Sequence, residues 1–272
     1  MQDFSFHNHT PRCGHAENFL DEDLVRVHIE KGFKHLAFTD HCPRRYFSHY
    51  PFHRSPMYFP EKEGYLRSIE NLKEKYADQI EIISGYEYEY VPGLEKETKE
   101  MRSEVQLMVQ GQHMIFGKDY DHFTRLHMPN FVPDDEQTIQ YAELLKRGCQ
   151  EGYTDIIAHP DLYMIHKTTF GKADEKAAHI ICQVAEQCDL PMEINLAIFA
   201  KNICLKPQRI TYPVPEFWSI ASTYNVKVLY GIDTHMLKQV ECYEQCLDDC
   251  LKFLGPELLG KFRFCSREDV RV

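Results

Sequence analysis

The sequence lacks any apolar run that approaches the roughly 20 residues needed to cross a membrane as a helix. Its first residues also lack the basic and then apolar order of a signal peptide. No Cys-x-x-Cys pair occurs, and the 10 cysteines are a small share of 272 residues, which is not typical of a secreted disulfide framework. We therefore expect reduced thiols, a cytoplasmic location and no membrane partner.

An excess of positive charge is also missing, because the formal net charge is −11. An acidic surface repels phosphate backbones and anionic lipid, so we expect no nucleic-acid partner. Bound divalent cations would still make one local site strongly positive inside such a protein.

No Ser/Gly-rich linker, charge block or sequence repeat divides the chain. Short apolar segments with strand character alternate seven times with helical segments, as is typical of a parallel sheet with helices outside it. The length matches a closed barrel of about 250 residues. The expected fold class is α/β, a distorted TIM-like (β/α)7 barrel that forms one domain over residues 1–272.

The expected elements follow from these patterns. The strands end near residues 9, 41, 90, 113, 159, 195 and 235, and a last strand is expected near 262–265. The helices are expected at 18–31, 62–76, 94–107, 138–151, 173–188, 215–224 and 238–254.

The first fifteen residues carry three histidines close together. His7 and His9 alternate at the end of the first expected strand, so both can face one point, and the loop that follows adds His15. Neutral imidazole is the commonest protein metal ligand. With 15 histidines in the chain, one His-x-His pair is expected by chance, so its meaning depends on partners at other strand ends.

Imidazole and carboxylate side chains follow six of the seven expected strands. In a parallel barrel all strands end at one mouth, where active sites of this architecture lie. Each such residue could singly be a hydrogen-bonded strand end or a helix N-cap, but together they indicate one metal cluster. Nitrogen and oxygen ligands of this kind suit Zn, Fe or Mn. The set is His7, His9, His15, Asp40, His41, Glu87, His113, His159, Asp233 and His235.

Other histidines and cysteines receive different interpretations. We expect structural or surface roles for His28, His35 and His179, and leave the roles of five loop histidines open. Those five are His49, His53, His122, His127 and His166. The cysteines at 242, 246 and 250 repeat every four residues, which makes one helical stripe that we interpret as packing.

The order and context of the strand-end motifs resemble those of the PHP (polymerase and histidinol phosphatase) superfamily, and more closely its histidinol-phosphatase branch. The resemblance covers nearly the whole chain. It rests on His7-Asn-His9, His15, Thr39-Asp-His41, Glu87, His113, His159 and Asp233-Thr-His235. The resemblance implies a distorted barrel that holds three divalent metal ions. It also implies an enzyme of histidine biosynthesis that hydrolyses L-histidinol phosphate to L-histidinol and phosphate.

The resemblance also implies how the ligands are shared among the three ions, and from the chemistry of clustered divalent cations we expect a metal-bridged hydroxide as the nucleophile. The first ion would be held by His7, His9, Glu87 and Asp233. The second would be held by Glu87 as a bridge, His113 and His159. The third would be held by His15, His41 and His235. Glu87 and Asp233 would be catalytic by holding the hydroxide through the metals, and Asp40 would orient a ligand imidazole.

The chain departs from the branch at the positions that grip phosphate. Relatives commonly place arginines after the fifth strand and after Glu-Ile-Asn of the sixth, whereas this chain has Lys167 and Lys201. Lysine binds phosphate as a point charge without the bidentate fork of arginine. The substrate-binding candidates are Arg12, Lys167, Lys201 and Arg209, and we expect the aromatic loop 42–60 to close over the leaving group.

A small phosphorylated substrate is the expected partner, since clustered divalent cations lower the pKa of bound water from about 15.7 toward 7 and neutralise phosphoryl oxygens. Three alternatives stay open. One is a phosphoesterase of the same kind that acts on another small phosphate ester or on nucleic acid ends. Another is a metal-storing or regulatory protein without turnover. The third is a metal-dependent amidohydrolase, which also opens with His-x-His but leaves His15, His41 and His235 unexplained.

Overall fold

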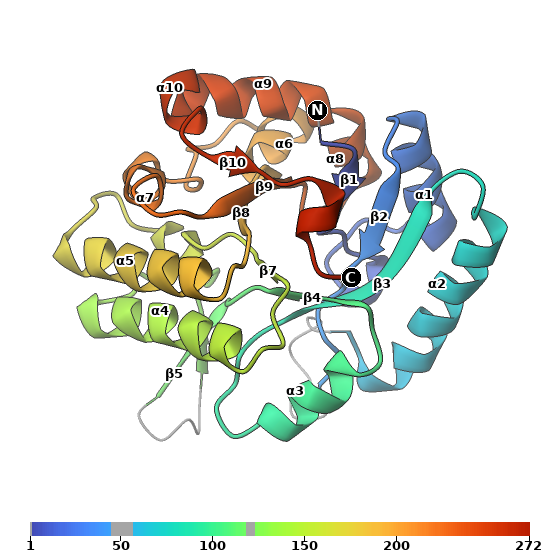
Figure 1. Cartoon of the computed structure of the whole chain (residues 1–272), viewed down its shortest axis with the longest axis horizontal. Coiled ribbons are helices and arrows are strands. Elements are labelled where there is room, and N and C mark those ends of the chain that lie inside the picture. Colours follow the sequence, from blue (N-terminus) through green and yellow to red (C-terminus); the bar gives the residue numbers. More distant parts are fainter. Residues whose placement is uncertain (1, 45–56, 118–122) are drawn as a thin grey trace.

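Eight parallel strands form one sheet that curves around a central axis in the computed structural model, which describes residues 2–44, 57–117 and 123–272 (Figure 1). The strands, in their order in the sheet, are β1 (Phe4–Ser5), β2 (His35–Phe38), β3 (Glu81–Tyr88), β4 (Leu107–Gln110), β7 (Ile156–Ile157), β8 (Met192–Asn195), β9 (Lys227–Gly231) and β10 (Arg263–Phe264). A parallel bridge between Asn8 and Thr234 joins the chain after β1 to the chain after β9. The backbone N–H of His9 donates to the carbonyl of Thr234 at 3.0 Å, so the ring closes at the carboxyl ends of its strands.

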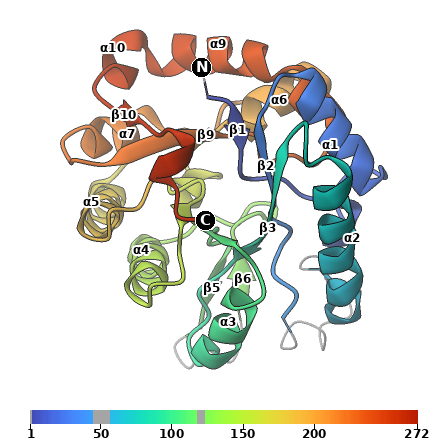
Figure 2. The same ribbon diagram turned by 45° about the vertical axis from the view of Figure 1, so that its right-hand side comes forward.

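The helices lie outside this ring, as Figures 1 and 2 show. They are α1 (Asp21–Glu30), α2 (Lys62–Lys75), α3 (Glu95–Arg102), α4 (Asp135–Gln150), α5 (Lys172–Gln187), α6 (Ala197–Cys204), α7 (Pro215–Ala221), α8 (Leu237–Glu241), α9 (Tyr243–Leu254) and α10 (Pro256–Leu259). The predicted α/β class and the distorted barrel are confirmed. None of the helices within the described residues combines the length and the apolar character needed to span a membrane.

Both faces of the sheet are buried, and the two-residue period of the strands sorts side chains between them. In β3, Ile82 packs outward into the large core beneath the helices, whereas Ile83 belongs to the smaller core inside the barrel. The inner core also contains Cys265 and Val270 of the C-terminal segment, which lies at the centre of the ring in Figures 1 and 2. This segment closes one end of the barrel and leaves the other end for polar side chains.

The same alternation carries two carboxylates into the barrel. Glu87 lies four residues after the inward-facing Ile83, and Glu193 alternates with the outward-facing Met192 and Ile194. Neighbouring strands make room for them with glycine. A Cβ on Gly111 would lie 1.9 Å from Glu87 Oε1, and one on Gly231 would lie 2.1 Å from Glu193 Cδ.

Four local predictions were wrong. Residues predicted to be irregular form β6 (Phe123–Arg125), which pairs antiparallel with β5 (Met114–Phe116). A helix that the pattern did not predict, α6, follows β8, and the expected helix 238–254 is divided at Cys242. The expected helix 94–107 ends at Arg102, because Leu107 already pairs with Gly85 of β3. These elements are short, and tertiary contacts rather than periodicity decide them.

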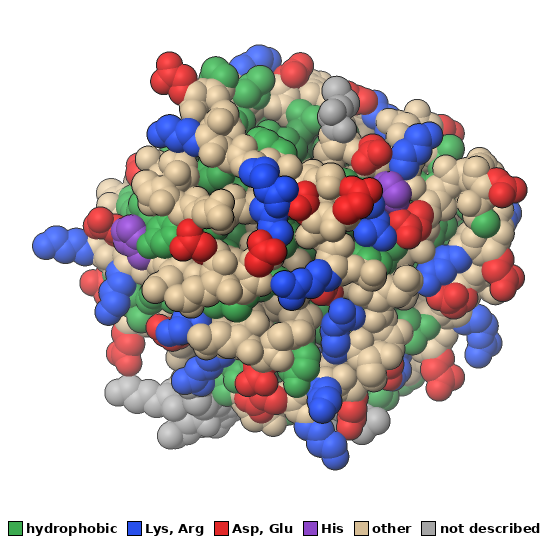
Figure 3. All heavy atoms as spheres, in the orientation of Figure 1, with side chains coloured by type: hydrophobic (Ala, Val, Ile, Leu, Met, Phe, Trp, Pro, Cys, Tyr) green, Lys and Arg blue, Asp and Glu red, His purple; other side chains and the backbone are tan. Residues whose placement is uncertain are grey.

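Charge is distributed evenly over the face drawn in Figure 3, where lysine and arginine alternate with aspartate and glutamate. The net charge of −11 therefore does not come from one acidic patch on that face. This pattern does not offer a long basic track for a nucleic-acid backbone there.

Candidate metal centre

Glu87, at the carboxyl end of β3, lies at the centre of a ring of histidines. One carboxylate oxygen, Oε1, lies 3.1 Å from His159 Nε2, 3.5 Å from His7 Nε2 and 3.6 Å from His113 Nε2. The other, Oε2, lies 2.8 Å from His41 Nδ1. A single buried carboxylate thus contacts imidazoles from four separate strand ends, which is the arrangement of a bridging metal ligand.

Asp233, which follows β9, is surrounded by a second group of histidines next to the group around Glu87. Its Oδ1 lies 3.2 Å from His9 Nε2, 3.7 Å from His7 Nε2 and 3.4 Å from His235 Nδ1. The Nε2 atoms of His235 and His15 lie only 2.8 Å apart. The structure therefore brings together the histidines and acids that the sequence placed at the mouth.

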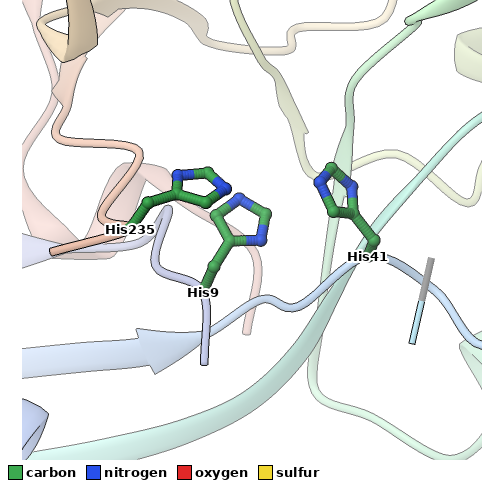
Figure 4. Close-up of side chains that lie close together, drawn as sticks. All are labelled: His9, His41 and His235. Carbon is green, nitrogen blue, oxygen red and sulfur yellow. The ribbon is translucent and has the colours of Figure 1, made fainter. Parts of the chain in front are cut away.

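The ring nitrogens of His9, His41 and His235 lie within 4.8 Å of one another, and Figure 4 shows the imidazole of His9 between the other two. Several further sets share this spacing. They include His7, His9 and Asp233, and also His7, Glu87 and His159. Groups of three nitrogen and oxygen donors at such distances can each hold a divalent cation.

Two of these residues have a strained backbone. His159 has φ of +26° and Asp233 has φ of +53°, a region that side chains other than glycine rarely adopt. Such conformations cost on the order of 1–3 kcal/mol and persist where the surroundings enforce them, often at functional sites. Both residues turn at the end of a strand, so the strain aims their side chains at the cluster.

Several buried nitrogens of the cluster have no hydrogen-bond partner among the described residues. They include Nε2 of His7 and both ring nitrogens of His9. A buried polar atom without a partner costs free energy. Carboxylate oxygens lie within 4 Å of these atoms, so a cation placed between nitrogen and oxygen would satisfy both. The donor set fits divalent metal ions.

The acids of the cluster stay ionised. Burial would raise the pKa of Glu87, but His113, His41 and His7 hold it well below its usual value. Burial likewise opposes the charge on Asp233, whose pKa is held well below its usual value by His7 and its other imidazole neighbours. The centre therefore carries fixed negative charge that requires nearby positive charge.

The imidazoles divide into two kinds. Burial lowers the pKa of His9, but Asp233 and Asp40 outweigh it and raise the pKa to about 9. Burial and the neighbouring His41 lower the pKa of His15 to about 3, so this ring keeps its lone pairs. Metal ions displace protons from rings of the first kind and bind rings of the second kind directly.

Asp40 lies next to His9, and Glu193 lies next to His7. Asp40 Oδ1 lies 3.6 Å from His9 Nδ1 and accepts the backbone N–H of Thr10 at 3.1 Å, which agrees in position with the predicted orienting role. Glu193 Oε2 lies 2.7 Å from His7 Nδ1, and the amide of Asn195 donates to its other oxygen. Sequence reasoning missed Glu193, although a charged residue within a buried apolar strand was the signal for it.

We expect Glu193→Gln to weaken metal binding or activity by about 10- to 100-fold, as is typical when the carboxylate behind a ligand histidine is lost. The amide keeps the size of the side chain and removes the charge that orients His7. Metal content per chain after dialysis would measure the effect. The matched control is Glu81→Gln, since Glu81 Oε2 contacts His35 Nδ1 at the same 2.7 Å but at the other end of the barrel. Full metal retention in Glu193→Gln would contradict this role.

A cavity of about 550 Å³ opens over the cluster. The sequence analysis assigned no role to several of the residues that line it, which are Arg44, Glu89, Arg125 and Tyr212. His127, one of the five loop histidines whose roles were left open, also lines it. The ring of His127 stacks at 5.6 Å from that of His113, and burial lowers its pKa well below the usual value.

The four residues that we predicted to bind phosphate do not lie together in the structure. Lys201 of α6 lines the cavity. Arg12 instead pairs with Asp21 at 2.7 Å, and Lys167 pairs with Asp174 at 2.5 Å. These two do not line the cavity, because a neighbouring acid already holds each one in another hollow.

Arg209 also lies outside the cavity, and its Nη2 donates to the carbonyl of Lys167 at 2.8 Å. Arg12, Lys167 and Arg209 thus lie outside the cavity, and their role as phosphate ligands stays a prediction. Most of the aromatic loop expected to close over the leaving group, together with His49, His53 and His122, lies outside the described residues.

Comparison with known families finds a match to the PHP domain over residues 5–197. A protein of Deinococcus radiodurans named a probable histidinol-phosphatase is 26% identical over 243 residues, which cover 86% of each chain. The histidinol-phosphatase of Bacillus subtilis is 32% identical over 99 residues, which cover 36% of this chain and 37% of that protein.

Solved structures share the fold. A candidate histidinol phosphatase of Listeria monocytogenes has a TM-score of 0.73 at 21% identity, with 87% of this chain and 96% of that chain covered. A histidinol phosphate phosphatase of Lactococcus lactis, solved with zinc, L-histidinol and phosphate, has a TM-score of 0.65 at 15% identity. The match covers 91% of this chain and 93% of that one.

Proposed function

This chain belongs to the PHP domain family, in its histidinol-phosphatase branch, and from that premise we propose that it hydrolyses L-histidinol phosphate to L-histidinol and phosphate. It is a phosphoric monoester hydrolase that depends on divalent metal. The observation that carries the proposal is the convergence of histidines from separate strand ends on Glu87 and Asp233 at the base of one cavity. In this proposal, residues 1–272 form a single phosphoesterase domain.

Three metal ions, with zinc, iron or manganese as candidates, suit the distribution of donors. The first would be held by His7, His9, Glu87 and Asp233. The second would be held by Glu87, His113 and His159. The third would be held by His15, His41 and His235. Such ions supply a nucleophile from water at neutral pH and neutralise the phosphoryl oxygens.

Residues that line the cavity would bind the substrate. Lys201 brings a positive charge to the cavity for the phosphate, and Arg125 at the end of β6 lies in the same wall. Glu89 adds a carboxylate that suits the protonated amine of histidinol. Leu162 and Tyr212 give the wall apolar surface, which excludes water from around the ester.

Lys201→Ala should raise KM for the phosphate ester by about 10- to 100-fold, because a hydrogen bond to a charged group contributes roughly 1.5–3 kcal/mol. Steady-state kinetics with histidinol phosphate would measure it. Lys206→Ala is the matched control, since this exposed lysine follows the same helix and does not line the cavity. Equal KM values for the two variants would remove Lys201 from the phosphate site.

The substrate is tested by phosphate release from a panel of esters by the metal-loaded protein. We expect kcat/KM to be highest for histidinol phosphate, above other small phosphate esters and above release of nucleotides from DNA ends. Faster turnover of another ester would reject this substrate and keep the phosphatase. Absence of turnover on every ester, with metal bound, would reject the enzyme itself.

A further inference from the structure

Three cysteines form a compact group of sulfur atoms away from the candidate metal centre. Cys204 lies at the end of α6, Cys242 lies where α8 ends and α9 begins, and Cys246 lies one turn further along α9. The Sγ atoms of Cys242 and Cys246 are 3.6 Å apart, and those of Cys204 and Cys242 are 3.9 Å apart. The helical spacing of the sequence had led us to interpret Cys242 and Cys246 as part of a packing stripe. Cys204 was not part of that stripe, because it belongs to another helix.

These distances match the edges of a tetrahedral metal site. With zinc–sulfur bonds of about 2.3 Å, two thiolates on the same ion lie about 3.8 Å apart. The cysteines at 242 and 246 are separated by one helical turn, and such a pair places two ligands on the same face of a helix. Cys242 thus lies at the spacing of a shared ion from each of the other two sulfur atoms.

A disulfide between Cys242 and Cys246 suits these positions poorly. It needs Cβ atoms about 3.5–4.5 Å apart, whereas residues four apart on a helix have Cβ atoms about 5–6 Å apart. The turn between Cys242 and Cys246 is intact, because the N–H of Cys246 donates to the carbonyl of Cys242 at 3.0 Å. A bridge between these two cysteines would have to break that turn.

The chemistry of the group favours a soft cation. Hydrogen bonds from the thiols of Cys246 and Cys204 lower the pKa of Cys242 to about 7 against the effect of burial. Burial and Cys242 raise the pKa of Cys204 to about 11, and the contact with Cys242 and burial also raise the pKa of Cys246, so a bound cation would displace the protons of these two thiols. The thiolate is the form that binds metal. Cys204 and Cys242 are both partly exposed, which gives an ion access from solvent, while Cys246 is buried.

We infer that Cys204, Cys242 and Cys246 form a second metal site, which takes one soft, thiophilic cation of the Zn²⁺ class through three sulfur atoms. Water is the natural fourth ligand of such a site. The ion would join α6, which carries Lys201, to the helices that follow His235. It would therefore stabilise one wall of the cavity without contacting the substrate.

Cobalt substitution tests the site, because Co²⁺ bound by thiolates gives a sulfur-to-cobalt charge-transfer band that nitrogen and oxygen ligands do not give. Titration of the metal-depleted full chain with Co²⁺ should produce this band, and its final intensity should correspond to one thiolate-bound ion per chain after the nitrogen and oxygen centre has also filled. The band should disappear in Cys242→Ser and weaken in Cys204→Ser. It should persist in Cys250→Ser, the matched control from the same stripe of α9, and in Cys13→Ser, the cysteine that lies beside His15 and His235.

A second measurement needs no variant. Zn²⁺ added to the metal-depleted protein should slow alkylation of Cys204 and Cys242 by a maleimide by about tenfold or more, read from peptide mass spectra. Absence of the band in the unaltered chain, its persistence in Cys242→Ser, or unchanged alkylation would each overturn the inference. A Cys204–Cys242 disulfide in protein isolated without oxidant would overturn it as well.

Discussion

Chelation of divalent metal will abolish phosphate release, and addition of Zn²⁺, Mn²⁺ or Fe²⁺ to the chelated protein will restore it. The reason lies in the arrangement of the mouth, where Glu87 and Asp233 face nitrogens of His7 and His9 that have no hydrogen-bond partner among the residues that the structure describes. Without a cation, this cluster can only neutralise its own acids with protons. Phosphate monoesters hydrolyse extremely slowly without catalysis, so we expect a loss of about 10³-fold or more. Phosphate release before chelation, after it and after reloading gives the measurement.

The chelation experiment has two controls. Circular dichroism should show that the barrel persists, and elemental analysis should show that the protein has lost its metal. Cys242→Ser separates the two proposed sites, because its activity should depend on metal as that of the unaltered chain does. A protein shown to be free of metal that keeps its full rate would contradict a metal-dependent mechanism.

The position of the candidate centre was predictable from the sequence because of two regular features. Parallel strands end at one rim, so a residue that follows a strand can be assigned to the mouth without knowledge of the packing. The two-residue period then decides which side chains face inward, as for Glu87 after Ile83. His7, His113 and His159 satisfied the first rule, and the structure brings all three to Glu87.

The basic residues followed neither rule. Arg12 and Lys167 lie in loops that turn back toward the first residues of a helix, where Asp21 and Asp174 hold them. Arg125 reaches the cavity from an antiparallel hairpin whose strands have only three residues each, too few for a period to show. The partner of a long, flexible side chain depends on nearby charge, which the order of residues along the chain does not reveal.

Glu193 shows a different limit. Its inward position followed from the same alternation that gave Glu87, but no strand-end rule applied, because it lies within β8. Its contact with His7 joins residues 186 positions apart in the chain. The role of such a residue becomes visible only when the register between distant strands is known.

Glu87→Gln should reduce kcat by about 10³-fold or more while the protein stays folded. The substitution keeps the volume of a side chain that is almost fully buried, so no cavity opens and no neighbour must move. It removes the one negative charge that five imidazoles share at 2.8–3.6 Å. A neutral amide binds a divalent ion weakly and cannot bridge two of them as a carboxylate does. Steady-state kinetics, with metal content per chain measured on the same sample, would check this result.

The matched control is Glu81→Gln, at the opposite end of the same strand, where the carboxylate contacts His35 and Arg267 near the surface. We expect that variant to keep its metal and its rate. Thermal unfolding of both variants separates a loss of chemistry from a loss of fold. If Glu87→Gln keeps both its metal content and its kcat, the histidines around it do not form a shared metal centre. If it keeps metal but loses turnover, Glu87 acts on the reaction after the ions have bound, which the position of its two oxygens between separate groups of histidines also allows.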